Sequence, residues 1–312
     1  VLDDIARTGG TDVVHANYWL SGVAGHEIKH ELGLPLVTTF HTLARVKADT
    51  GDDEPEHRVD AETEVIACSD VITANSIAEA QQLVRFYDAE PDRIEEVPPG
   101  VEHALFSPGD QAGARAAIGL GPGPLLMFVG RIQPLKGLDV AVQALASLDR
   151  SDATLLVVGG ASGRQGNGEV ARITSLIDEL GVGPQVRFVD PVPHHLLSTY
   201  YRAADVVLAP SRSESFGLVA LEAAACGTPV VAAAVGGLRS LVDHGRTGFL
   251  VEGRDAAVFG AYANEVLDSP LLAAEMAMNA AEKARGYTWG AMADRLMGIY
   301  GRLQDRSLVL CG

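Results

Sequence analysis

Cysteine, aromatic residues and long apolar runs are all scarce in this sequence. Its three cysteines, Cys68, Cys226 and Cys311, are odd in number and have no CxxC spacing, which argues against a disulfide framework and against a zinc site. Apolar runs such as LLMFV and TLLVV fall far short of the roughly 20 residues that span a bilayer, and no basic-then-apolar signal peptide opens the chain. These absences predict a protein of the reducing cytoplasm, without a stable membrane anchor.

Basic residues are in the minority, because 24 Lys and Arg face 41 Asp and Glu and the formal net charge is -17. Such a chain repels a long anionic partner such as nucleic acid unless a local basic stripe overcomes the field, and the sequence has no such stripe. We therefore expect small-molecule partners and no nucleic acid. The sequence leaves a homodimer open.

Small apolar residues are plentiful, and a 47% hydrophobic content over 312 residues predicts an α/β protein with two domains. Short β-branched runs alternate with longer Ala/Leu-rich stretches, the pattern of parallel βαβ units whose sheets are covered on both faces. The expected strands are 12–16, 35–40, 70–75 and 93–98 in the first part, and 125–130, 154–160, 186–190, 205–211 and 229–233 in the second.

Proline and glycine concentrate in the segment VPPGVEHALFSPGD (97–110), which predicts a domain boundary there. We expect a first domain over residues 1–107, a second over 108–287, and a C-terminal helix in 288–312 that packs back onto the first domain. The chain begins at Val1 inside what looks like a helix, so the first domain is expected to be incomplete at its start.

Two carboxylates, Glu214 and Glu222, surround a turn that runs into an apolar helix in the segment RSESFGLVALEAAACG (212–227). A helix N-terminus offers unpaired N–H groups and partial positive charge that suit a phosphate, and nearby carboxylates accept hydrogen bonds from sugar hydroxyls. This pattern predicts a nucleotide-sugar site. The competing interpretation is a pair of surface charges on an amphipathic helix.

Two cations, Arg131 and Lys136, follow an expected strand and Gly130 in the segment GRIQPLKG. At the carboxyl end of a parallel strand they focus positive potential on one point, where a diphosphate can bind to the planar fork of Arg and the point charge of Lys. Gly159 and Gly160 end the next strand, and glycine lets the backbone approach a ligand closely. A solvated pair of cations and a plain tight turn are the alternatives.

Taken together, these segments resemble the retaining glycosyltransferases of family 4, which have the GT-B architecture of two Rossmann-like domains facing across a crevice. The resemblance covers nearly the whole chain. Its carriers are FVGRIQPLKG (128–137), VVGGASG (157–163), the segment 200–232 and VGGLRSLVDHGRTGFLV (235–251). Within that family, HANYWLSG (15–22) and TFHTLARVK (39–47) resemble the mycothiol-pathway enzymes that glycosylate D-inositol 3-phosphate.

For the second domain, the resemblance implies a site for the sugar donor. Arg131 and Lys136, beside Gly130, are expected to bind the donor diphosphate, Glu222 the ribose hydroxyls, and Glu214 the region of the donor sugar and its anomeric carbon. The backbone expected to hold the sugar hydroxyls belongs to Ser215, Phe216, Gly217 and Leu218. The chemistry implied requires no cofactor and no metal, and a structural divalent ion is left open.

For the first domain, the resemblance implies contacts to the reacting sugars. His41 is expected to contact the donor sugar and to stabilise positive charge there, as a member of a catalytic set with Arg131, Lys136 and Glu214. Tyr18, Thr42 and Arg58 match acceptor-contacting positions, with Arg58 suited to a phosphate. A surface salt bridge is the alternative for Arg58, because its acidic surroundings match the family only loosely.

The reaction implied is transfer of a sugar from a UDP-sugar, with UDP-N-acetylglucosamine as the expected donor, to a hydroxyl of a small polar acceptor such as 1D-myo-inositol 3-phosphate, with retention at the anomeric carbon. Another acceptor, as in a lipid mannosyltransferase or a sucrose-type synthase, stays open, as does a UDP-binding, catalytically incomplete fragment. A nucleotide-sugar epimerase is disfavoured by the GRIQPLKG and ESFGLVALE segments. A nicotinamide oxidoreductase is disfavoured because no GxGxxG follows a strand with an acidic residue about 20 positions on.

Overall fold

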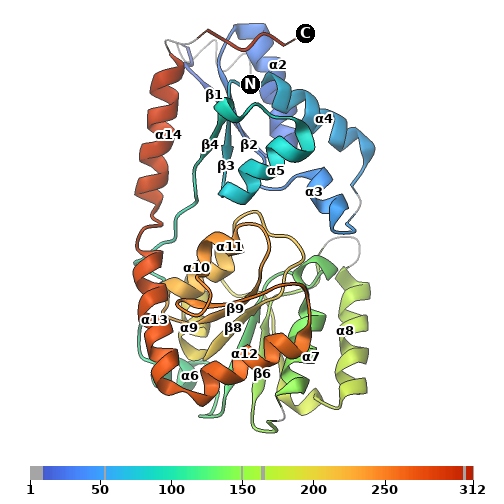
Figure 1. Cartoon of the computed structure of the whole chain (residues 1–312), viewed down its shortest axis with the longest axis vertical. Coiled ribbons are helices and arrows are strands. Elements are labelled where there is room, and N and C mark those ends of the chain that lie inside the picture. Colours follow the sequence, from blue (N-terminus) through green and yellow to red (C-terminus); the bar gives the residue numbers. More distant parts are fainter. Residues whose placement is uncertain (1–9, 53, 149, 163–165, 305–306, 312) are drawn as a thin grey trace. The chain divides into compact units, whose positions relative to one another are not determined.

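The computed structural model describes residues 10–52, 54–148, 150–162, 166–304 and 307–311. By its internal contacts the chain divides into unit 1, Val1–Gly100 with Trp289–Gly312, and unit 2, Val101–Thr288 (Figure 1). The sequence placed the boundaries after residues 107 and 287, and the structure divides the chain after 100 and 288.

Unit 1 contains a four-stranded parallel sheet in the order β1-β2-β3-β4. Its strands are β1 (Val14–Asn17), β2 (Leu36–Thr39), β3 (Val71–Ala74) and β4 (Ile94–Glu96). The strands β2, β3 and β4 lie within strands expected from the sequence, and β1 extends one residue beyond its expected strand, to Asn17. The residues of β2 and β3 are buried on both faces, as parallel strands covered by helices require.

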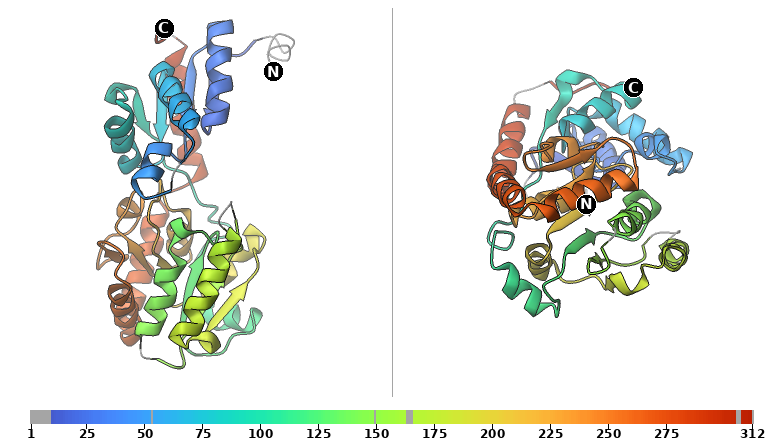
Figure 2. Two further views of the ribbon diagram at one scale, coloured as in Figure 1. Left: turned by 90° about the vertical axis from the view of Figure 1, so that its right-hand side faces the viewer. Right: turned by 60° about the horizontal axis from the view of Figure 1, so that its bottom comes forward.

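Helices cover both faces of the unit 1 sheet (Figure 2). These are α2 (Trp19–Leu32), α3 (Ala44–Asp49), α4 (Glu56–Cys68), α5 (Ile77–Tyr87) and α14 (Trp289–Leu303), with the 3-10 turn η1 (Pro91–Arg93). Side chains of β3 alternate between the two layers, so that Ile72 packs with α4 and α5 whereas Val71 packs with Ile299 and Leu303 of α14. The C-terminal helix therefore closes the core of unit 1.

Unit 2 contains a six-stranded parallel sheet in the order β10-β9-β8-β5-β6-β7, the doubly wound order of a Rossmann fold. Its strands are β5 (Leu125–Val129), β6 (Thr154–Val158), β7 (Val186–Val189), β8 (Val206–Ala209), β9 (Val230–Ala233) and β10 (Gly248–Val251). The strand β10 was not expected, because its apolar run FLV is very short and follows the turn-rich segment HGRTG. The expectation of two parallel-sheet, Rossmann-like units is confirmed.

Two helical layers enclose the unit 2 sheet, one built largely from α7, α8 and α12 and the other from α6, α9 and α10. The helices are α6 (Gln111–Ala117), α7 (Leu138–Ser147), α8 (Gly166–Leu180), α9 (His194–Ala203), α10 (Leu218–Ala225), α11 (Leu238–Leu241), α12 (Ala256–Asp268) and α13 (Pro270–Ala284), with η2 (Pro134–Lys136) and η3 (Gly183–Gln185). Among the helices within the described ranges, none is long and apolar enough to cross a membrane.

Cys68 and Cys311 form a disulfide, so the expectation that the cysteines form no such bond was wrong. The two residues are 243 positions apart in sequence, yet their Cα atoms lie 5.3 Å apart. The spacing of cysteines along the chain indicates only pairs that are close in sequence. This disulfide forms because the segment after α14 returns to the end of α4. Cys226 is a free, buried thiol, and burial raises its pKa to about 12.

Candidate functional site

The loops that follow β5 and β8 meet at the point where the strand order of unit 2 reverses. From β5, the chain places β6 and β7 on one side and β8, β9 and β10 on the other. Such a switch point at the carboxyl ends of parallel strands is where open α/β sheets bind ligands. The two loops are joined by a hydrogen bond of 2.8 Å from Arg212 N to Leu135 O. This edge carries most of the site residues expected in the second domain.

Lys136 and Glu214, which we call the switch-point pair, form an ion pair between these loops. Lys136 Nζ donates to Glu214 Oε2 at 2.6 Å, and the Ser211 hydroxyl lies 3.4 Å from the same oxygen. The two side chains retain 21% and 20% exposure, so both remain reachable from solvent. With Gly217, they line a small cavity at the start of α10. The structure thus brings together an expected diphosphate ligand and an expected sugar ligand.

Close backbone approach fixes the position of Glu214. Gly237 N donates to Glu214 O at 2.9 Å, and Gly236 has a φ of +47°. A Cβ at Gly236 would lie 1.8 Å from Glu214 O, so no side chain fits there. Gly137 plays a similar part beside Lys136, because its φ is +72° and a Cβ would lie 2.2 Å from Pro210 O. The switch-point pair therefore rests on backbone contacts.

The remaining expected residues of this loop region differ in exposure. Arg131 is exposed in the loop after β5, beside Gly130. Phe216 is buried and packs against Tyr287, with ring centroids 5.8 Å apart. Leu218 is exposed at the first position of α10, whose N-cap residue supplies no side-chain hydrogen bond to the helix. The first N–H groups of α10 therefore lack a side-chain cap at the edge that carries the switch-point pair.

Glu222 is buried on α10, and its carboxylate binds two residues of α9. His194 Nε2 lies 2.8 Å from Oε1, and the Tyr201 hydroxyl donates to Oε2 at 2.8 Å. Burial, with Glu222 as a second cause, raises the pKa of Tyr201 well above its usual range, so Tyr201 stays a neutral donor. Sequence reasoning missed both partners. The spacing of His194 and Tyr201, seven positions apart on one helix face, was the available signal.

In unit 1, His41 lies in the loop between β2 and α3 and has a left-handed φ of +61°. Its Nε2 lies 2.9 Å from Asn17 Oδ1, at the end of the neighbouring strand β1. Desolvation lowers the pKa of His41, which favours a neutral imidazole. His41 and Asn17 therefore lie together at the carboxyl edge of the unit 1 sheet.

Arg58, Thr42 and Tyr18 come together although they are far apart in the sequence. The Nη2 atom of Arg58 donates to Thr42 O at 3.1 Å and to Thr42 Oγ1 at 3.0 Å. The guanidinium also lies over the Tyr18 ring, 5.3 Å from its centroid. Arg58 is only 3% exposed, so it is not the surface salt bridge considered as the alternative.

A buried carboxylate, Glu62, holds this arrangement in place. It accepts hydrogen bonds from Arg58 Nε at 2.7 Å, from Ala44 N at 2.8 Å and from the Tyr87 hydroxyl. Arg58 also pairs with Glu54 at 3.0 Å. We call Arg58, Thr42, Glu54, Glu62 and Tyr87 the Arg58 network. Sequence reasoning missed Glu62 and Tyr87, and the i,i+4 spacing of Arg58 and Glu62 on α4 was the signal.

A second histidine of unit 1, His15 on β1, is half-buried between β2 and the C-terminal helix. Its Nδ1 lies 2.6 Å from the Tyr300 hydroxyl and its Nε2 lies 2.8 Å from Thr39 Oγ1. Desolvation, and then the nearby His41, lower the pKa of His15 to about 4. His15 is therefore neutral at physiological pH.

A larger cavity, of about 810 Å³, lies elsewhere in unit 2. It is lined by Pro108, Arg115, Asp205 and Met278, among others. Asp205 immediately precedes β8, so this cavity opens at the amino ends of the strands. Ligands of open α/β sheets bind at the carboxyl ends. We therefore place the candidate site at the switch point, where the cavity is smaller but the charged groups converge.

Two family models match the chain. The model described as "Glycosyl transferases group 1" matches residues 114–286, and the model described as "Glycosyltransferase Family 4" matches residues 1–105. The D-inositol 3-phosphate glycosyltransferase of Acidothermus cellulolyticus is 47% identical over 303 residues, which cover 94% of this chain and 67% of that protein. The protein of the same name from Actinosynnema mirum is 46% identical, over 95% of this chain and 74% of that one.

Solved structures also resemble the whole chain. Sucrose-phosphate synthase from Thermosynechococcus elongatus gives a TM-score of 0.89 at 33% identity and covers 97% of this chain and 76% of its own. HepE from Anabaena, solved in complex with UDP-glucose, gives a TM-score of 0.86 at 22% identity, over 96% of this chain and 81% of its own. At that identity the likeness to HepE concerns the fold alone.

Proposed function

Since this chain belongs to the group 1, family 4 glycosyltransferases and has their GT-B fold, we propose that it transfers N-acetylglucosamine from UDP-N-acetylglucosamine to 1D-myo-inositol 3-phosphate, with retention at the anomeric carbon. The observation that carries the proposal is the switch-point pair, in which an expected diphosphate ligand and an expected sugar ligand meet at 2.6 Å. The name of the relatives that are 46–47% identical supports the acceptor.

The donor binds at unit 2 in this proposal. When a diphosphate binds beside Lys136, the Lys136 ammonium pairs with the diphosphate instead of with Glu214. The Glu214 carboxylate is then free to accept hydrogen bonds from sugar hydroxyls. Arg131, exposed in the same loop, adds a second cation. Glu222, fixed by His194 and Tyr201, binds the ribose hydroxyls. The fold shared with HepE, which was solved with UDP-glucose, agrees with a nucleotide-sugar donor.

Catalysis follows from where negative charge develops. As the bond between sugar and phosphate lengthens, the sugar gains oxocarbenium character and the diphosphate gains charge, which Lys136, Arg131 and the start of α10 stabilise. The acceptor hydroxyl attacks the anomeric carbon from the face that the diphosphate leaves, so the configuration at this carbon is retained. The hydroxyl passes its proton to the departing phosphate. Neutral His41 contributes hydrogen bonding and dipolar stabilisation near the sugar, and no metal takes part in these steps.

The acceptor binds to groups of unit 1. Arg58 suits a phosphate because its charge is permanent and its fork is planar. Its Nη2 atom is engaged by Thr42, so a phosphate binds by taking over this donor while Glu62 keeps Nε in position, and the released Thr42 hydroxyl then binds the acceptor. Tyr18, stacked on the guanidinium, supplies a hydroxyl for the inositol ring.

A product assay tests this function. The chain is incubated with UDP-N-acetylglucosamine and 1D-myo-inositol 3-phosphate, the glycosylated phosphate is detected by mass spectrometry, and the anomeric configuration is read by proton NMR. An α-linked product from the α-linked donor supports the proposal. A β-linked product contradicts retention, and UDP binding by calorimetry without any product contradicts the acceptor.

A sucrose-type reaction is the second candidate, favoured by the 33% identity and TM-score of 0.89 to sucrose-phosphate synthase. The names of both relatives contain a phosphate ester, of inositol in one and of sucrose in the other, which agrees with a phosphate ligand such as Arg58 in either case. Formation of sucrose phosphate in the same mass-spectrometric assay, in place of the inositol product, would select this candidate.

A further inference from the structure

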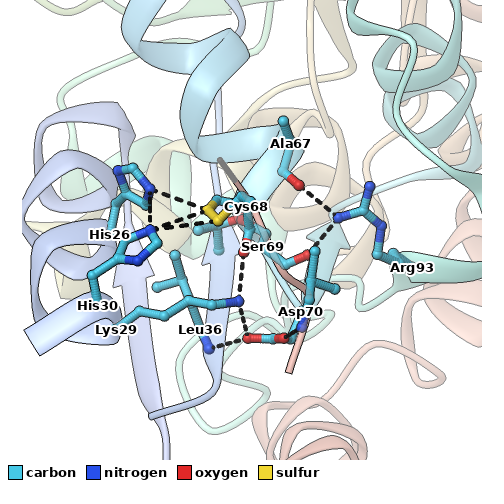
Figure 3. A network of polar contacts seen from close by, with 12 residues as sticks. His26, Lys29, His30, Leu36, Ala67, Cys68, Ser69, Asp70 and Arg93 are labelled. Carbon is cyan, nitrogen blue, oxygen red and sulfur yellow. Dashed lines mark hydrogen bonds and ion pairs between the residues drawn. A yellow bond between two sulfur atoms is a disulfide. The ribbon is translucent and has the colours of Figure 1, made fainter. Parts of the chain in front are cut away.

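Four side chains of unit 1 with metal-binding atoms gather at one point, away from every residue discussed so far for catalysis (Figure 3). His26 and His30 lie on α2, Cys68 ends α4 and Cys311 belongs to the C-terminal segment. One ligand atom from each lies within 4.8 Å of all the others. We call these four residues the His/Cys cluster.

The distances in the His/Cys cluster approach those of a tetrahedral zinc site. The two Nε2 atoms are 2.9 Å apart, His26 Nε2 is 3.1 Å from Cys68 Sγ, and His30 Nε2 is 3.5 Å from Cys68 Sγ and 3.4 Å from Cys311 Sγ. Zn–N bonds of about 2.0–2.1 Å and Zn–S bonds of about 2.3 Å give tetrahedron edges of roughly 3.3–3.8 Å. Small outward movements of the side chains are therefore enough to admit the ion, once the sulfur atoms are no longer bonded to each other.

The chemistry of the donors selects zinc. Two thiolates and two imidazoles form the Cys₂His₂ set of structural zinc sites, and the three-residue gap between His26 and His30 is within the H-x₃₋₅-H spacing of such sites. Glu64 Oε1 lies 3.7 Å from His26 Nδ1, on the side of the ring opposite the cluster. A carboxylate in that position orients a metal-bound imidazole.

The fold holds the C-terminal segment at the cluster independently of the cysteines. Val309 N donates to Asp70 Oδ1 at 2.6 Å. Lys29 Nζ donates at 2.7 Å both to Asp70 Oδ2 and to Cys68 O (Figure 3). A surface cavity of about 520 Å³, lined by His26, Cys68 and Cys311, gives small molecules access. Breaking the disulfide therefore leaves both sulfur atoms near the histidines and within reach of solutes.

We propose that His26, His30, Cys68 and Cys311 bind one Zn²⁺ ion when the Cys68–Cys311 disulfide is reduced. A dithiol reductant supplies two electrons and two protons, which convert the disulfide into two thiols while the reductant becomes a disulfide. The two thiols then lose their protons to solvent as two Zn–S bonds form, and the neutral imidazoles donate their Nε2 lone pairs. The ion replaces the disulfide as the link between the C-terminal segment, α2 and α4.

Metal binding by the full chain tests the proposal. The protein is reduced with dithiothreitol, the reductant is removed without air, and Zn²⁺ or Co²⁺ is titrated in. We expect one equivalent of bound metal and, for Co²⁺, the intense visible bands and thiolate charge-transfer absorption of a tetrahedral thiolate site. The oxidised chain is expected to bind none, because its sulfur atoms cannot become thiolates.

Single substitutions locate the site. Cys311→Ser and His30→Gln, both at residues that are not fully buried, are expected to weaken Zn²⁺ binding by more than about 100-fold, since loss of a direct ligand exceeds the 10–100-fold cost of losing an outer-shell partner. The matched controls Cys226→Ser and His195→Gln, outside the cluster, should retain one equivalent. A reduced wild-type chain that binds neither metal, or binding that survives both ligand substitutions, would overturn the proposal.

Discussion

The two units hold their candidate residues by different means. In unit 2, Lys136 and Glu214 sit on loops that glycine brings into backbone contact, and both side chains are partly exposed. In unit 1, Arg58 is almost fully buried and is held by Glu62, Glu54 and Thr42. In unit 2, backbone contacts therefore position charged side chains that solvent can reach. In unit 1, side-chain contacts position Arg58, and a ligand must replace some of them to bind.

This difference matches the two substrates proposed. A nucleotide-sugar donor is common to many glycosyltransferases, and backbone contacts can position its ligands without depending on particular side chains. An acceptor defines one enzyme, and a side-chain network can change with few substitutions. The comparison therefore predicts that substitutions in unit 1 destabilise the protein by leaving a buried charge unpaired. Substitutions in unit 2 are expected to act by displacing the backbone that positions the site.

The largest effect is expected from Glu62→Ala, which removes the central acceptor of the Arg58 network. Loss of one partner of a buried ion pair typically costs about 3–5 kcal/mol. Denaturant unfolding should show this loss of stability, with faster amide exchange in α3, α4 and α5. Glu95→Ala, which breaks an exposed pair with Arg302, is the control and should cost about 0–1 kcal/mol. Equal effects of the two substitutions would contradict the network.

A smaller effect is expected from Gly236→Ala in unit 2, where the new Cβ meets Glu214 O. The left-handed backbone and the overlap together should cost roughly 2–4 kcal/mol and weaken binding of UDP-N-acetylglucosamine, because Glu214, the expected ligand of the donor sugar, is displaced. Gly245→Ala is the matched control, since its φ is +76° but nothing lies within 4 Å of the added Cβ. If calorimetry shows the same affinity for UDP-N-acetylglucosamine in both variants, backbone contact does not position Glu214.

The same difference explains how much of the fold and of the candidate site could be predicted from the sequence alone. The strands and the segments around Lys136 and Glu214 were predictable, because their signals are local runs of apolar residues, glycines and charges. The strand β10 was too short to stand out. Glu62, Tyr87 and the Cys68–Cys311 bond were not predicted, because their meaning depends on which distant segments meet.

Within unit 2, Glu214→Gln and Glu222→Gln are expected to separate turnover from nucleotide binding. Glu214→Gln should lower kcat by about 10–100-fold, equivalent to about 1.4–2.8 kcal/mol, with little change in UDP affinity. Glu222→Gln should weaken UDP binding by about 1–2 kcal/mol, since a charged acceptor for ribose becomes neutral. Steady-state kinetics and UDP titration check the pair, and the reverse pattern would exchange the two roles.

A smaller effect is expected on the stability of unit 1 when the pH is lowered. His15 has a pKa of about 4 in the folded chain against an ordinary 6.5, so its contribution to stability is complete above pH 6.5 and is lost as pH falls toward 4. Discounted for partial exposure and for the nearby His41, this is about 1–2 kcal/mol. Buried Glu79, whose pKa is raised to about 7, acts in the opposite direction in the same unit.

Comparison of the wild type with His15→Gln isolates this effect, because Glu79 contributes equally to both proteins. The stability difference between the two, measured by denaturant unfolding at a series of pH values, should shift in favour of the variant between pH 6.5 and 4. A difference that stays constant across this range would show that His15 is not buried as a neutral side chain.

The most direct test of the division between the units is a crossed kinetic measurement. The Michaelis constants for UDP-N-acetylglucosamine and for 1D-myo-inositol 3-phosphate are compared in the wild type, Lys136→Ala and Thr42→Val. Lys136→Ala should raise the donor constant by about 5–150-fold and leave the acceptor constant unchanged, whereas exposed Thr42→Val should raise only the acceptor constant, by about 2–10-fold. A Thr42→Val variant that moves the donor constant, or a Lys136→Ala variant that moves neither, would contradict the account.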